Sequence, residues 1–427
     1  MVVTGAFTAV VLYERLFVEK TFGPSAIVGV AILLSIFFLL LATYVLQGTR
    51  HQAAMGKLWL AGTSVAVSYV ALDLLAGFFL IRPLSPALVP DEYLHHKLVP
   101  NSNSRLEQRD FSYIQRVNNF GLRGRDISLE TPPNTYRILM LGDSFTMGKG
   151  VEDDQTFSAL LEKSLNAEAS KCGGRSVEVL NGGVDSYAPI LSLLELERNL
   201  GQLKPDMVIL NFDASDLVQE SAYRREAVYG PGGEVVAVPM RAAKKSLNDR
   251  VRLWAERHLF FTRFLLFSVN KLFGYRSLTT RELLTQANLE VVAHTLTQDD
   301  APRDSQWKNV FASIGGIKEY CASRGIEFVL SIYPWAHQVS ETEWIPGRYN
   351  FMPRNATPSD RSADILRVYA ADKGIELVDA FPVFRRYRGQ EALFFKYDMH
   401  WTAAGNKVMA QGLEDHLRQR HPWLGCR

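Results

Sequence analysis

The first candidate for chemistry is a serine that follows an apolar run. The segment "RILMLGDSFTMGKG" spans residues 137–150, and its apolar stretch 138–141 ends directly before Gly142, Asp143 and Ser144. Asp and Ser are common N-caps in strand-to-helix turns, so a purely structural interpretation is available. The alternative is that Ser144 is a nucleophile at the carboxyl edge of a sheet. A nucleophilic serine also needs a base, a carboxylate that orients the base, and donors for the oxyanion.

Two of the nine histidines are candidates for the base: His337 in "PWAHQ" and His400 in "YDMHWTAAG". Asp398 lies two residues before His400, and residues i and i+2 of an extended stretch point to the same face. A carboxylate at that position can accept from one imidazole nitrogen while the other nitrogen faces the serine. Thr402 is suited to cap the helix that follows. The spacing favours His400, and His337 stays open as the alternative.

These residues need a scaffold, and alternating apolar and amphipathic segments predict one. The expected strands are 137–141, 177–180, 207–210 and the apolar runs in "GIEFVLSIYPW" and "GIELVDAF". Helices are expected after Asp153–Asp154, over 191–200 and over about 402–417. This alternation is typical of an α/β protein whose parallel sheet is covered on both faces, with ligands at the carboxyl ends of the strands.

The N-terminal part of the chain has a different character. Residues 24–46 contain no charged side chain, and residues 58–81 contain one, Asp73, so both segments are long and apolar enough to be predicted membrane spans. Residues 1–18 would form an interfacial segment or a third span. The loop 47–57 carries Arg50 and Lys57, and the positive-inside rule places it in the cytoplasm. The residues after Arg82 would then lie outside the cytoplasm.

Composition excludes several classes of protein. The 427 residues carry a formal net charge of +2, which gives no reason to expect binding to nucleic acid. The cysteines, Cys172, Cys321 and Cys426, lie far apart and support neither a zinc site nor a disulfide framework, although one bridge between Cys172 and Cys321 stays open. The sequence shows no phosphate loop, HExxH or GxSxG motif. No metal and no cofactor are expected.

At this point the sequence resembles the SGNH (GDSL-type) hydrolases. The segment "RILMLGDSFTMGKGVEDDQTFSALLEKSL" is similar to the first block of that family, and "NNFGLRG", "VEVLNGGVDSYAP", "KPDMVILNFDASDL" and "YDMHWTAAG" follow its order over about residues 117–217 and 326–418. The resemblance implies a flavodoxin-like three-layer α/β/α sandwich that hydrolyses or transfers acyl esters. It also implies that Ser144 is the nucleophile, His400 the base and Asp398 the partner of the base.

The sequence departs from the family pattern at the expected oxyanion hole. The family usually has glycine at the position of Ser186, where a backbone N–H donates, and asparagine at the position of Ser215. Ser186, Ser215 and Gly183 are the expected oxyanion and substrate-binding residues. Loss of one oxyanion donor costs about 100- to 1000-fold in turnover. Weak hydrolysis, a different substrate and acyl transfer therefore all stay open.

The predicted organisation has three parts: a membrane region over 1–85, a linker and lead-in over 86–134, and a hydrolase-like domain over 135–420 with a helical insert at about 218–305. The predicted function is that of a membrane-anchored serine esterase or O-acyltransferase acting on acyl esters of a glycan or lipid. The first alternative is a degenerate, non-catalytic member that binds a polysaccharide or an assembly partner. The second is a transport-associated membrane protein with an ancillary soluble part.

Overall fold

The computed structural model describes part of the chain. The described residues are 64, 67–69, 71–73, 88–172, 174–240, 286–297 and 304–422. The chain divides into two compact units, Met1–Pro83 with Ala243–Arg276, and Leu84–Ala242 with Ser277–Arg427. In the first unit the few described residues, between 64 and 73, are helical. The features below all belong to the second unit.

The predicted membrane segments fall outside this description. Residues 1–18 and the span 24–46 are not described, and the span 58–81 is described only for the few residues between 64 and 73. Across the described ranges, no helix combines the length and apolar character needed to span a membrane.

A five-stranded parallel sheet forms the centre of the second unit, as the sequence predicts. Its strands, in spatial order, are β11 (Glu376–Asp379), β10 (Glu327–Ile332), β7 (Met207–Phe212), β5 (Thr135–Gly142) and β6 (Ser176–Gly183). Counted along the chain from the β6 edge, the order is second, first, third, fourth, fifth, which is the flavodoxin-like order. Every residue of β5 and β7 is buried, as expected for parallel strands that are covered on both faces.

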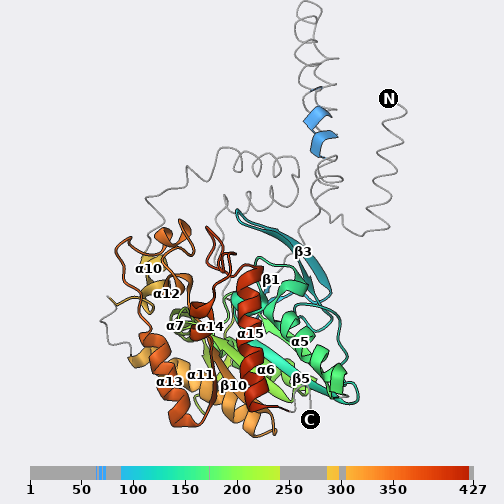
Figure 1. The fold of residues 1–427 in the computed structure, drawn as a ribbon. Helices are drawn as coiled ribbons and strands as arrows, with labels where there is room; N and C mark the ends of the chain where they lie inside the picture. Colours follow the sequence, from blue (N-terminus) through green and yellow to red (C-terminus); the bar gives the residue numbers. More distant parts are fainter. Residues whose placement is uncertain are drawn as a thin grey trace, which may run out of the picture. The chain divides into compact units, whose positions relative to one another are not determined.

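Helices cover both faces of the sheet (Figure 1). On one face, α5 (Phe157–Cys172), α14 (Phe381–Arg386) and α15 (Ala403–Arg420) pack against side chains such as Ile138 and Met140. On the other face, α6 (Pro189–Arg198), α11 (Asp304–Ala322) and α13 (Arg361–Lys373) pack against Leu139 and Leu141. Successive strand residues thus enter two separate apolar cores, which gives three layers.

The segment that the sequence predicts to be linker and lead-in contains two antiparallel hairpins. They are β1 (Leu88–Pro90) with β2 (His96–Leu98), and β3 (Ser102–Glu107) with β4 (Ser112–Val117). Burial alternates along β4, so Tyr113, Gln115 and Val117 point inward. These hairpins bring polar groups to the site described below.

The insert at about 218–305 is not wholly helical where the structure describes it. Besides α7 (Asp216–Glu226) and α10 (Gln286–Ala293), it contains the two short strands β8 (Val228–Tyr229) and β9 (Val235–Ala237). The turn at Gly230–Gly233 joins them, because the Gly233 N–H donates to the Gly230 carbonyl at 3.0 Å. Residues 241–285 of the insert are outside the described ranges. Cys321 is a buried free thiol, so the bridge to Cys172 that the sequence left open is not formed.

Candidate active site

Ser144 begins the short helix α4 (Ser144–Met147) where β5 ends. Gly142 is required here: its φ is +148°, and a Cβ atom would lie 2.3 Å from Thr146 Oγ1 and 2.9 Å from the Asn211 carbonyl oxygen. Asp143 is the N-cap, since its carboxylate accepts the Phe145 N–H at 2.8 Å. The capping role therefore belongs to Asp143, and the Ser144 hydroxyl is available for another partner.

That partner is His400, as the sequence predicts. The Ser144 Oγ lies 2.7 Å from His400 Nε2. The His400 Nδ1 hydrogen bonds to Asp398 Oδ1, which also accepts the backbone N–H of His400 at 3.0 Å. With the Nδ1 proton directed at Asp398, Nε2 is free to accept from the serine. Burial raises the pKa of Asp398, but the hydrogen bond and charge of His400 outweigh burial and lower it.

The loop that carries Asp398 and His400 is held from the lead-in. Asp110, between β3 and β4, accepts the backbone N–H groups of Tyr397 and Asp398, each at 2.7 Å. Within the loop, the Phe395 N–H donates to the His400 carbonyl at 3.0 Å. No sequence motif marks Asp110, because its partners are nearly three hundred residues away.

The alternative base, His337, has a different partner. It lies in the short helix α12 (Ala336–Val339), and its Nε2 is 2.7 Å from Thr295 Oγ1. Burial lowers the pKa of His337 to about 3, so the ring is neutral at physiological pH. The structure therefore places His400, and not His337, beside Ser144.

Two backbone N–H groups are available as oxyanion donors. Within the described part of the chain, the N–H groups of Ser144 and Ser186 donate to no acceptor. Ser186 has φ +63°, a left-handed conformation that glycine adopts more easily, and glycine is the residue that the related family carries here. Tyr223 holds this turn, because its hydroxyl donates to the Ser186 carbonyl at 2.8 Å.

The other two predicted donors are occupied. The hydroxyl and the N–H of Ser215 both donate to Asp213 Oδ1 at 2.6 Å. The Gly183 N–H donates to Asn181 Oδ1 at 3.1 Å, and a Cβ at Gly183 would lie 2.2 Å from the Met147 nitrogen. Gly183 is therefore needed for the close approach of β6 to α4, and Ser215 stabilises a buried carboxylate.

Three buried carboxyl groups, which the sequence interpretation missed, follow the carboxyl ends of β5 and β7: Asp143, Asp213 and Asp216. Burial, followed by the charge of Asp213, raises the pKa of Asp143, and burial likewise raises the pKa of Asp213 and Asp216. Asp143 also accepts from the Tyr333 hydroxyl at 3.2 Å. In the described ranges, no group of His, Cys, Asp and Glu side chains is arranged to hold a metal ion.

Arg123, from the "NNFGLRG" segment, holds the loop that follows α4. Its guanidinium is buried and donates to the carbonyls of Met147 and Gly148, at 2.7 and 2.5 Å, and to that of Val151 at 2.5 Å. It also pairs with Asp153 at 2.9 Å. These contacts satisfy carbonyl groups that the end of a helix leaves without intrahelical partners.

A comparison with known protein families gives a match over the C-terminal part of the chain. Residues 293–426 match the family described as SGNH hydrolase-like domain, acetyltransferase AlgX, a match that includes Asp398 and His400 but not Ser144. These residues thus match an SGNH hydrolase-like domain, the family that the sequence resemblance indicates. The comparison with curated proteins gives no match.

Several solved structures are similar to the chain at low identity. A catalytic mutant of an acetylxylan esterase from Geobacillus stearothermophilus is 13% identical, with a TM-score of 0.36, 68% of this chain covered and 96% of that chain. The lipase/acylhydrolase from Enterococcus faecalis is 13% identical, with a TM-score of 0.35 and coverages of 67% and 96%. An alpha/beta hydrolase enzyme from the metagenome of Lake Arreo, Spain, is 15% identical, with a TM-score of 0.35 and coverages of 66% and 94%.

Proposed function

We propose that this protein is a serine esterase or O-acyltransferase in which Ser144 is the nucleophile, His400 the base and Asp398 the residue that orients the base. The observation that carries the proposal is the 2.7 Å contact between Ser144 Oγ and His400 Nε2, with Asp398 bonded to the opposite ring nitrogen. The family match to an acetyltransferase-type SGNH domain supports the same reaction class.

The reaction follows from this arrangement. Ser144 Oγ attacks the ester carbonyl while His400 Nε2 takes its proton, and the N–H groups of Ser144 and Ser186 stabilise the oxyanion. Collapse breaks the bond to the alcohol, which leaves with the proton from His400. Water or a second alcohol then attacks the acyl-serine, with His400 again as base, and the acid or a new ester is released.

The substrate is proposed to be an acyl ester of a glycan or lipid, and the hydrolase-like domain is proposed to be anchored to the membrane outside the cytoplasm. The apolar segments 24–46 and 58–81 and the basic loop between them support the anchoring. The departure at Ser215 supports a slow hydrolase or a transferase, because the hydroxyl expected to donate to the oxyanion donates to Asp213.

A serine-directed fluorophosphonate tests the proposal. The wild-type protein should become labelled, and Ser144→Ala should not; His400→Ala should slow labelling by at least 100-fold, because the base is lost. Labelling that persists in Ser144→Ala would disprove the nucleophile. A screen of nitrophenyl esters with acyl chains of increasing length then identifies the acyl group.

A non-catalytic, glycan-binding role is the second candidate. The observation that favours it is the group of buried carboxyl groups at Asp143, Asp213 and Asp216, because acidic groups near the nucleophile disfavour the negative charge of an oxyanion. A folded wild-type protein that resists the fluorophosphonate and hydrolyses no nitrophenyl ester, but binds a polysaccharide, would support this alternative.

A further inference from the structure

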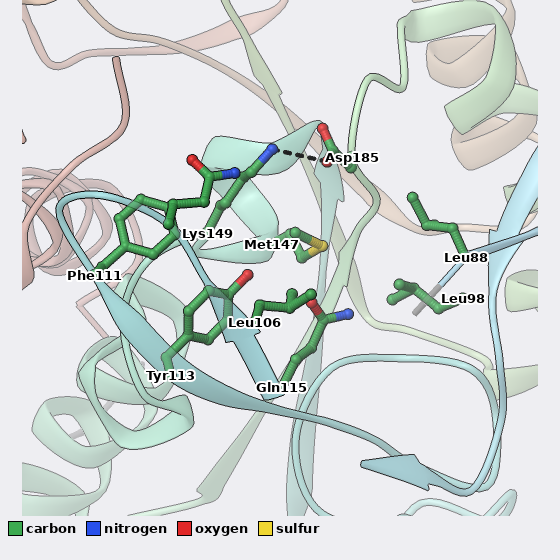
Figure 2. A pocket seen from close by; sticks show the side chains of 10 residues that line it. Leu88, Leu98, Leu106, Phe111, Tyr113, Gln115, Met147, Lys149 and Asp185 are labelled. Carbon is green, nitrogen blue, oxygen red and sulfur yellow. Dashed lines mark hydrogen bonds and ion pairs between the residues drawn. The ribbon is translucent and has the colours of Figure 1, made fainter. Parts of the chain in front are cut away.

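A cavity of about 250 Å³ lies between the lead-in hairpins and the loop after α4 (Figure 2). Its walls are mostly apolar, from Leu88, Leu98 and Leu106 of the hairpins and Met147 of α4. Polar groups enter at a few points only. A largely apolar cavity with a small number of polar groups is typical of a site that binds an organic molecule.

Polar groups of β4 point into this cavity with unused hydrogen-bonding capacity. Gln115 is 1% exposed, and neither its amide oxygen nor its amide nitrogen has a hydrogen-bond partner among the described residues. Tyr113 is 2% exposed, and its O–H donates to no acceptor within the same ranges. Burial raises the pKa of this phenol to about 12, although the nearby Gly150 backbone favours the ionised form and lowers it. Figure 2 shows both side chains extending from β4 toward Met147. The Gln115 amide and the Tyr113 O–H donor therefore have hydrogen-bonding capacity that a polar molecule in the cavity would use.

The cavity adjoins the proposed catalytic serine. Met147 is the last residue of the helix that Ser144 begins, and the Lys149 N–H donates to the Ser144 carbonyl at 3.0 Å. Asp185, which also lines the cavity, directly precedes Ser186. A molecule in the cavity would therefore contact the C-terminal end of the helix that carries Ser144 and the residue next to Ser186.

The two charged residues that line the cavity, Lys149 and Asp185, form an ion pair. Lys149 Nζ lies 3.0 Å from Asp185 Oδ2, and both side chains are partly exposed. The two charges neutralise each other, so the cavity favours a ligand without net charge. An alkyl chain fits the walls but leaves the Gln115 amide and Tyr113 hydroxyl unpaired, whereas a ring with hydroxyl groups satisfies both.

We propose that this cavity binds a neutral sugar ring in the alcohol part of the ester, and that Gln115 and Tyr113 hydrogen bond to the hydroxyl groups of the ring. Gln115 offers one acceptor and two donors, and Tyr113 offers one of each, which suits adjacent hydroxyls. The C–H faces of the ring pack on Leu98, Leu106 and Met147. The proposal rests on the proposed function in so far as the sugar is part of the ester that Ser144 attacks.

Binding to full-length Ser144→Ala protein in detergent tests the proposal without turnover. The probes are methyl glycosides of glucose, galactose and mannose with an acetyl ester at O6, compared with cyclohexylmethyl acetate, which has the same ester on a ring without oxygens. At least one sugar ester should bind tenfold or more tightly than cyclohexylmethyl acetate, measured by saturation-transfer NMR titration. If cyclohexylmethyl acetate binds as tightly as every sugar ester, the cavity is an alkyl site and the proposal fails.

Substitutions in the cavity test whether its residues cause the preference for the sugar ester over cyclohexylmethyl acetate. Gln115→Leu and, separately, Tyr113→Phe should each reduce the preference for the sugar ester at least threefold, since each removes hydrogen-bonding atoms but keeps the side-chain volume. Tyr229→Phe is the matched control, because Tyr229 is half exposed and its hydroxyl donates to the Arg224 carbonyl elsewhere. An unchanged preference in both cavity variants would overturn the assignment.

The two proposals fail in different ways. A wild-type protein that the fluorophosphonate does not label disproves the esterase but leaves sugar binding measurable, because the binding assay uses no catalysis. Labelled protein without sugar preference disproves the cavity proposal alone. If Gln115→Leu does not fold, Tyr113→Phe, which removes only a hydroxyl, decides the outcome.

Discussion

Ser144 and Asp143 divide two roles that either residue could have taken. The Asp143 carboxylate accepts the Phe145 N–H and caps α4, so the Ser144 hydroxyl is directed at His400 instead of at its own helix. A serine that only capped the helix would bond to a nearby backbone N–H. Because Asp143 already caps α4, helix capping does not explain the serine at position 144.

The three residues of the proposed triad should behave as one unit. Ser144→Ala and His400→Ala should each lower kcat/KM on a nitrophenyl acyl ester roughly 1000-fold or more, and the double variant should be hardly worse, because both residues serve one proton transfer. Asp398→Asn should cost less, since it disturbs the orientation and tautomer of His400 and leaves the base in place. Steady-state kinetics on wild type and the four variants measures this.

His337→Ala is the control for the triad. The His337 ring hydrogen bonds to Thr295 and takes no part in the proposed triad. His337→Ala should therefore leave kcat/KM within a few-fold of wild type, measured at a temperature at which both proteins are folded. Activity that disappears in His337→Ala and survives in His400→Ala would mean that the base is wrongly assigned.

Asp213 makes stability depend on pH with a definite sign. Because burial raises its pKa in the folded protein, Asp213 keeps a proton that the unfolded chain releases above its ordinary pKa of about 3.9. The stability linked to this group is present at low pH and is lost as pH rises from that value through the raised pKa. Asp213→Asn removes the titration but can still accept from the Ser215 N–H.

The expected result is a stability difference that grows with pH. Thermal unfolding of wild type and Asp213→Asn should show a gain in Tm for the variant that is larger at pH 8 than at pH 5. Ser215→Ala is the companion variant: it removes one donor to the Asp213 carboxylate and should increase the pH sensitivity. Identical pH profiles for wild type and Asp213→Asn would show that Asp213 is ionised throughout this range.

At the scale of elements, the loop after α4 depends on one buried guanidinium. Arg123→Met keeps much of the side-chain volume but leaves the carbonyls of Met147, Gly148 and Val151 without their donor and Asp153 without its ion pair. Breaking a buried charged network costs about 3–5 kcal/mol, so a clear drop in Tm is expected. Turnover should also fall, because α4 carries Ser144.

Arg116→Met is the matched control for Arg123. Arg116 lies 3.9 Å from the same Asp153, but its side chain is 65% exposed, so the pair contributes little. Differential scanning calorimetry should show a small change for Arg116→Met and a large one for Arg123→Met. Equal effects would indicate that the charge of Asp153, and not the carbonyl contacts, is what matters.

The elements that the sequence predicts well are those whose pattern is local. The strands β5 and β7 read as apolar runs because both of their faces are covered, and the final helix, predicted over about 402–417, is observed at Ala403–Arg420. The positions of Ser144, Asp398 and His400 at strand ends and before a helix follow from these elements.

The lead-in hairpins could not be predicted in the same way. In β4 the exposed residue Ile114 is apolar and the buried residue Gln115 is polar, which inverts the pattern that usually identifies a half-buried strand. The contacts of Asp110 with the loop of Asp398 are set by tertiary packing across the chain. The hydrogen bonds from Ser215 to Asp213 likewise depend on the conformation of a turn, which the residue types alone do not determine.

At the scale of the whole molecule, the proposed active site is assembled from two parts of the chain that the sequence separates into lead-in and hydrolase-like domain. Residues 102–117 supply Asp110 to the loop of His400, and Tyr113 and Gln115 to the cavity. The lead-in is therefore expected to affect substrate choice as well as stability, since it contacts the loop that carries the base and lines the cavity next to α4.

The orientation of the chain in the membrane is a prediction at this same scale. Two spans, 24–46 and 58–81, joined by the loop with Arg50 and Lys57, would place residues 84–427 outside the cytoplasm. A fluorescent protein that matures only in the cytoplasm, fused after Arg427, should stay dark, whereas alkaline phosphatase at the same position should be active. Replacing Arg50 and Lys57 by glutamine should weaken this preference, because the charges of the short loop set the orientation. A bright fluorescent fusion with inactive phosphatase would place the proposed esterase in the cytoplasm and remove extracytoplasmic glycans from its substrates.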